Sequence, residues 1–179
     1  MENRETWLRQ TKLIGLDGEP LVLYHGTRSL EPFSEFRPSV SGAQGPGIYM
    51  ADEPGHYGVR TMRLHVRMTN PFYFYPSDES LEADINCELI EQVLPADIAS
   101  MVIERLDRDG YNHYGTEVQD ALKAQGYDGI VMIYPFGEPK LQDQPGSAVV
   151  IAFDPKQILI LPEKAPAPLQ ELVDDSPAP

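Results

Sequence analysis

Short β-prone segments lie on both sides of a helical block, and this arrangement most constrains the fold of the chain. Residues 62–68 alternate apolar and polar side chains, which predicts a strand with one buried face. Because the helices are grouped in mid-chain and do not alternate with strands, we expect an α+β fold rather than a doubly wound α/β fold. The other predicted strands cover residues 21–24, 47–51, 130–134, 148–153 and 157–161, with an aromatic β-prone stretch at 72–75, and the predicted helices cover 4–13, 81–106 with a break near Pro95, and 116–125.

Length and composition predict one folded domain followed by a tail. A chain of 179 residues has the size of about one domain, and a hydrophobic content of 41% is enough to build a core. Residues 162–179 are rich in proline and acidic side chains and contain no aromatic residue, so they cannot bury enough apolar surface to offset the entropy of ordering. We therefore expect a domain at residues 5–161 and a flexible tail at 162–179.

The strong negative charge argues against several classes of partner. The chain has 28 acidic and 14 basic residues, for a formal net charge of −14. Nucleic acids and anionic membranes are held by Lys and Arg, so this balance argues against an electrostatic grip on either. Cys87 has no second cysteine with which to pair, and the histidines do not show the spacing of metal ligands. No stretch approaches ~20 consecutive apolar residues. We expect a soluble, cytoplasmic protein without a metal ion.

Two acidic residues are predicted to cap helices. Asp52 is followed by Glu53 and Pro54, a pattern typical of an N-cap and a first helical turn, and Asp97 follows the break at Pro95. We interpret Asp52 and Glu53 as capping or solvated acids.

The first motif that could carry chemistry is Tyr-His-Gly-Thr at residues 24–27. A histidine where a strand opens into a loop can donate or accept a hydrogen bond at a cleft. The glycine that follows has no side chain, so a ligand can approach the main chain closely. A histidine packed at the end of a strand explains the same pattern, so this motif alone does not decide between the two.

The second motif is Gly-Ile-Tyr-Met-Ala-Asp at residues 47–52. Its tyrosine, Tyr49, offers a flat aromatic face that can stack on a planar ring such as nicotinamide. Taken alone, a tyrosine on a strand is more often part of the core.

Together the two motifs resemble those of ADP-ribosyltransferases of the diphtheria-toxin and poly(ADP-ribose) polymerase type. They are more closely similar to the small transferase domains of polyvalent proteins in phages and mobile elements. The resemblance runs in order over residues 7–161 and includes Asn-Pro at 70–71, Gln-Gly-Tyr-Asp-Gly-Ile at 125–130 and Ala-Phe-Asp-Pro-Lys-Gln-Ile at 152–158.

This resemblance implies a split β-sandwich of short strands that holds NAD, as substrate, in the cleft between two sheets. The family carries a His-Tyr-Glu set. By this resemblance, His25 would form a hydrogen bond with a ribose hydroxyl of NAD, the backbone of Gly26 would bind the nicotinamide amide, and Tyr49 would stack on the nicotinamide ring. Tyr57 corresponds to a further aromatic residue on a short helix.

Thr27 and Arg28 are also assigned to NAD binding. Thr27 completes the first motif, and Arg28 could face the adenosine or pyrophosphate side, because a guanidinium group suits phosphate.

The sequence departs from the family at the third member of the set. Val149 occupies the position of the glutamate, which in the family contacts a ribose hydroxyl and stabilises the oxocarbenium-like transition state. A valine can do neither. Of the polar residues in the loop before Val149, Gln144 and Asp143 are the best candidates to replace the glutamate catalytically.

Two functions from different classes remain open at this point. The first is a mono-ADP-ribosyltransferase that modifies a macromolecular acceptor, a protein rather than a nucleic acid, in the manner of a toxin or effector. Transfer of a single unit is favoured because chain extension depends on the missing glutamate. The second is a catalytically degenerate module that binds NAD, ADP-ribose or a protein without turnover. Val149 favours the module, and the presence of His25, Gly26 and Tyr49 favours the enzyme.

Overall fold

A computed structural model describes residues 4–29, 31, 33–40, 42–55, 58–77, 82–109 and 115–162. The predicted tail therefore lies outside the described residues except for Pro162. The strands are β1 (Leu23–Thr27), β2 (Ile48–Ala51), β3 (Arg60–Val66), β4 (Pro71–Phe74), β5 (Gly129–Tyr134), β6 (Ser147–Ala152) and β7 (Ile158–Ile160), and the helices are α1 (Arg4–Leu8), α2 (Glu82–Val93), α3 (Ala96–Asp109), α4 (Glu117–Ala124) and the 3₁₀ turn η1 (Pro155–Gln157).

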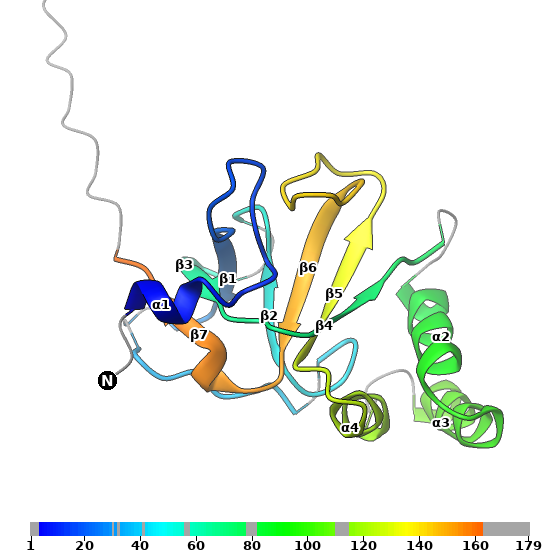
Figure 1. The fold of residues 1–179 in the computed structure, drawn as a ribbon. Coiled ribbons are helices and arrows are strands. Elements are labelled where there is room, and N and C mark those ends of the chain that lie inside the picture. Colours follow the sequence, from blue (N-terminus) through cyan, green and yellow to red (C-terminus); the bar gives the residue numbers. More distant parts are fainter. Residues whose placement is uncertain are drawn as a thin grey trace, which may run out of the picture.

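The strands form one mixed sheet in the order β4-β5-β6-β2-β1-β3-β7. β4 and β5 are parallel, and the other neighbouring pairs are antiparallel. The structure confirms a mixed α+β architecture with the helices grouped between β4 and β5. In Figure 1, α2, α3 and α4 lie together on one side of the sheet, away from α1 and β7. Within the described residues, no helix combines the length and the apolar character needed to cross a membrane.

Alternating side chains place two cores on the two faces of the sheet. In β6, Val150 faces a core shared with β1, β2 and β3, whereas Ile151 faces the helices α2, α3 and α4. In β5, Val131 likewise faces the core shared with β1, β2 and β3, and Met132 faces the helices. This is the period-2 geometry of strands buried on both faces, which explains the nearly continuous Val and Ile runs of β5 and β6.

The first strand lies further along the chain than the sequence predicts, and residues 21–22 are not part of it. Residues 21–24 were expected to form it, but β1 runs to Thr27 because all five of its residues pair with β3, from Leu23 with Leu64 to Thr27 with Arg60. His25 therefore lies within a strand and not at the mouth of a loop. The position expected to cap the second helix is also different, because Asp97 lies inside α3.

Asp52 does not begin a helix, and the prediction of a capping or solvated acid is wrong for this residue. Its side chain is buried with 7% of its surface exposed. Its backbone N–H donates to the carbonyl oxygen of Ala148 at 3.1 Å, and its carboxylate accepts the N–H of Ala148 at 2.6 Å. The carboxylate therefore extends the pairing of β2 with β6, because it supplies the acceptor that a further strand residue would otherwise provide.

Asp52 should make stability depend on pH. Burial raises the pKa of its carboxyl above the ordinary value of 3.8, and the hydrogen bond from Ala148 opposes this only in part. The folded state therefore holds the proton more tightly than the unfolded state, so the contribution to stability is present below pH 3.8 and is lost as pH rises through the raised pKa. Urea denaturation at a series of pH values would test this. As pH rises through the raised pKa, the free energy of unfolding of the wild type should fall relative to that of Asp52→Asn. The same pH dependence in the two proteins would contradict the prediction.

Candidate functional site

A cavity of about 580 Å³ opens at the centre of the sheet, where β1 and β2 lie side by side. This volume falls within the range of small-molecule sites, about 300–1,000 Å³. Its lining includes Tyr24, His25 and Gly26 of β1, Tyr49 and Ala51 of β2, and Val149 of β6. The structure therefore brings together the residues that the two sequence motifs singled out.

The cavity exists because β1 and β2 separate after a single paired position. That position is Tyr24 with Ala51, whereas β1 pairs with β3 at five positions. By strand alternation His25 and Tyr49 belong to opposite faces of the sheet, since Met62, which pairs with His25, is in one core and Tyr49 packs against the other. Both residues nevertheless line the cavity, and Nδ1 of His25 reaches across to the carbonyl oxygen of Tyr49.

The ring of His25 is held in one orientation. Its Nδ1 lies 2.8 Å from the carbonyl oxygen of Tyr49, and its ring packs edge-to-face against Phe36 at 5.0 Å and Phe33 at 6.5 Å between centroids. A carbonyl oxygen can only accept, so Nδ1 must carry the proton of this bond. In the neutral imidazole Nε2 is then unprotonated and can accept a hydrogen bond from a ligand hydroxyl.

The ring of Tyr49 is held by a glycine-rich loop. Its hydroxyl donates to the carbonyl oxygen of Gly45 at 2.6 Å and accepts the N–H of Gln44 at 3.0 Å. Burial raises the pKa of Tyr49, so the hydroxyl stays protonated and remains a donor. A side chain at Gly42 would collide with the Tyr49 ring, so this loop can lie against the ring only because Gly42 has no Cβ.

A buried amide network fastens this loop to the helices. Gln44 is 6% exposed and donates from Nε2 to Asn86 of α2 at 3.2 Å. Gln119 of α4 is 1% exposed and donates to the carbonyl oxygen of Gln44 at 2.6 Å. Buried amides are costly unless they are bonded, so the network favours one position of the loop. The helical block thereby fixes the orientation of Tyr49 from outside the sheet.

Tyr49→Phe should lower the free energy of unfolding by about 1–3 kcal/mol, because it leaves the Gly45 carbonyl and the Gln44 N–H without their partner. Chemical denaturation followed by tryptophan fluorescence would measure the change. Tyr127→Phe is the matched control, because Tyr127 packs by its ring against Phe72 at 5.3 Å and should lose little. Equal losses in the two variants would show that the hydroxyl of Tyr49 has no special role.

The remaining predicted site residues fall in different parts of the molecule. Thr27 lies at the end of β1, and its hydroxyl accepts the N–H of Ser29. Gln144 accepts the hydroxyl of Tyr75 at 2.9 Å, and Asp143 has a left-handed backbone with φ of 60°. The described residues that line the cavity include none of these, nor Arg28, and Tyr57 lies outside the described residues.

Sequence reasoning missed several residues of the site. The cavity is also lined by Glu53 beyond β2, by Ile85 of α2 and by Tyr134 of β5. Helical periodicity placed α2 in the core without indicating that it forms a wall of a cavity. No local pattern pointed to Glu53, because β2 ends at Ala51 and the chain bends at residues 52–54. Among the described residues no group of three or more His, Cys, Asp or Glu side chains could hold a metal ion.

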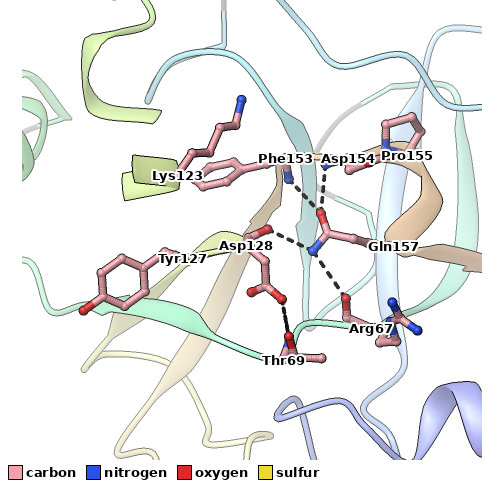
Figure 2. A pocket seen from close by; sticks show the side chains of 9 residues that line it. All are labelled: Arg67, Thr69, Lys123, Tyr127, Asp128, Phe153, Asp154, Pro155 and Gln157. Atoms are coloured by element: carbon pink, nitrogen blue, oxygen red, sulfur yellow. Dashed lines mark hydrogen bonds between the residues drawn. The ribbon is translucent and has the colours of Figure 1, made fainter. Parts of the chain in front are cut away.

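A second cavity, of about 610 Å³, lies where β3 and β6 end and β5 begins (Figure 2). Its polar groups are bonded to one another. Gln157 accepts the N–H groups of Phe153 and Asp154 at 3.1 and 2.8 Å, and it donates to the carbonyl oxygens of Arg67 and Asp128 at 3.3 and 2.9 Å. Figure 2 shows this amide at the centre of the bonded groups, so it ties three strands together.

Asp128 adds further hydrogen bonds to this junction of three strands at the second cavity. Its carboxylate accepts the N–H and the hydroxyl of Thr69 at 2.6 and 2.9 Å and the N–H of Asn70 at 3.1 Å. The segments at 70–71, 125–130 and 152–158, which carry much of the sequence resemblance, therefore meet here and hold the sheet together. Their polar groups are used in the fold.

Comparison with known proteins gives a family match. A family model described as ADP-ribosyltransferase in polyvalent proteins matches residues 16–165, which include both cavities. No curated protein and no solved structure matches the chain.

Proposed function

Because the chain belongs to the family of ADP-ribosyltransferases in polyvalent proteins, we propose that it transfers one ADP-ribose unit from NAD to a macromolecular acceptor. ADP-ribosyltransferase domains use NAD as their substrate in general. The observation that carries the proposal for this chain is that His25, Gly26 and Tyr49 line one cavity of about 580 Å³ at the opening between β1 and β2.

The geometry suggests how each residue would hold NAD. In the neutral tautomer Nε2 of His25 accepts a ribose hydroxyl, since its Nδ1 is already committed to the carbonyl oxygen of Tyr49. The nicotinamide ring stacks on Tyr49, whose own ring is fixed through its hydroxyl. Gly26 lets the nicotinamide amide approach the main chain. In this proposal the two halves of the sheet act as a split β-sandwich that holds the dinucleotide.

The reaction needs no redox step. The bond between the ribose C1′ and the nicotinamide nitrogen breaks, and its electron pair leaves with nicotinamide. A nucleophile of the acceptor forms the new bond at C1′ and gives up one proton. The enzyme contributes by orienting the ribose and by stabilising the positive charge that develops on it.

The acceptor is best matched by a protein with a basic surface. The net charge of −14 repels the phosphates of a nucleic acid and attracts Lys- and Arg-rich surfaces. This complementarity would speed the encounter more than it would tighten the complex.

The test is incubation with NAD in the presence of cell-lysate proteins. Nicotinamide release and the addition of one ADP-ribose mass to an acceptor are expected from the wild type, and neither is expected from His25→Ala or Tyr49→Ala. Repeating units of added mass would contradict single transfer.

A second candidate is an NAD- or ADP-ribose-binding module without turnover. Val149 favours it, because a valine lines the cavity where the family carries its glutamate. Calorimetry that shows NAD binding, together with no nicotinamide release under any acceptor condition, would favour the module over the transferase.

A further inference from the structure

We propose that Glu53, carried by the segment after β2, supplies the catalytic carboxylate that Val149 cannot. This inference rests on the proposed function and deepens it, because it names the group that would stabilise the transition state. Among the described residues that line the cavity with His25 and Tyr49, Glu53 is the only acid.

The register of the sheet brings Glu53 close to Val149. Ala51 pairs directly with Val149, and the next residue, Asp52, continues the pairing through two hydrogen bonds to Ala148. Glu53 follows in the bend after β2, and it lines the same cavity as Val149.

The other acids near this position are committed elsewhere. The Asp52 carboxylate is bonded to the N–H of Ala148, and Asp52 is buried and does not line the cavity. Asp143 is exposed, and neither it nor Gln144 lines the cavity. Gln144 is also an amide, which carries no negative charge, and its oxygen already accepts the hydroxyl of Tyr75.

Lys140 contacts Glu53 from a neighbouring pocket, which both residues line. Its Nζ lies 3.8 Å from Oε1 of Glu53 but 3.0 Å from Oε2 of Glu138, so Glu138 is its closer partner. The hydrogen bond that Lys140 donates to Glu138 is the main cause that raises the pKa of Lys140, so the lysine stays charged. The side chain of Glu53 is 46% exposed, so it can leave the long contact with Lys140 when a ligand enters.

Glu53 is assigned two successive roles. Its carboxylate first stabilises positive charge on the ribose and then acts as a base. As the bond from C1′ to nicotinamide breaks, its electron pair goes to nicotinamide and the ribose becomes positively charged. The Glu53 carboxylate faces this charge and accepts a hydrogen bond from a ribose hydroxyl. When the acceptor nucleophile bonds to C1′, its proton passes to the carboxylate and then to water.

The deciding experiment compares Glu53→Gln with the wild type in the full chain. The amide keeps the shape of the side chain and removes its charge. We expect kcat for nicotinamide release to fall by about 10²–10³-fold, as when a single group that stabilises a developing charge is lost, with little change in KM for NAD. Glu138→Gln is the matched control. It removes the other carboxylate beside Lys140 but lies outside the cavity lining, so its kcat should stay near that of the wild type.

A second variant tests the position independently. The double variant Glu53→Gln, Val149→Glu places a carboxylate on the facing strand. Its kcat should be at least about tenfold higher than that of Glu53→Gln alone, which corresponds to 1.36 kcal/mol. Full activity in Glu53→Gln, with loss in His25→Ala, would overturn the role of Glu53 and leave the proposed function intact. A wild type that binds NAD by calorimetry but releases no nicotinamide would overturn the proposed function, and the role of Glu53 with it.

Discussion

His25→Ala should lower kcat/KM for NAD by at least about 100-fold, close to 2.7 kcal/mol of transition-state stabilisation at 1.36 kcal/mol for each factor of ten. The imidazole spans the opening of the sheet, with Nδ1 bound to the carbonyl oxygen of Tyr49 at 2.8 Å and its ring held against Phe36. Alanine removes the group that would accept the ribose hydroxyl and also the link between β1 and β2. Steady-state release of nicotinamide measures the loss.

A second substitution separates these two effects of His25. In His25→Asn the amide N–H can still donate to the carbonyl of Tyr49, but nothing replaces Nε2. We expect this variant to stay folded, with a free energy of unfolding closer to that of the wild type than His25→Ala, and to remain nearly as inactive as the alanine variant. Wild-type activity in His25→Asn would show that Nε2 does not contact the substrate.

Gln157→Ala should lower the free energy of unfolding by about 3 kcal/mol, the largest effect on stability that we expect from a substitution outside the first cavity. One amide makes four hydrogen bonds at the junction in Figure 2, two that it accepts and two that it donates. Its removal leaves the carbonyl oxygens of Arg67 and Asp128 without this donor. Urea denaturation with an unchanged m-value would measure the loss as a change in the native state.

Two controls make the result for Gln157 specific. Gln142→Ala removes an exposed glutamine and should change the free energy of unfolding by no more than about 0.5 kcal/mol. Gln157→Glu keeps an oxygen that can accept the N–H groups of Phe153 and Asp154, but it turns a second oxygen toward two carbonyl oxygens. It should therefore be as unstable as the alanine variant or nearly so, and wild-type stability in Gln157→Glu would show that the donated bonds contribute little.

Local patterns were sufficient to predict the class of fold, and two motifs that carry the family resemblance singled out three residues that line one cavity. The alternation at residues 62–68 predicted β3, and the grouping of helices in mid-chain predicted α+β, because strand and helix periods depend on neighbouring residues. The two motifs at 24–27 and 47–52 indicated His25, Gly26 and Tyr49, which line one cavity. These residues could be found because they lie in short motifs that are continuous in the sequence.

Other features depended on which strands become neighbours, and no local pattern contains that information. Asp52 looks like a helix cap in the sequence, but it binds the N–H of a residue 96 positions away because β2 pairs with β6. The same pairing sets Glu53 beside Val149, and packing against α4 brings Gln119 to the loop that holds Tyr49. Hydrogen bonds and buried surface act between whatever groups are close in space, so partners this far apart along the chain become visible only once the sheet and helices are assembled.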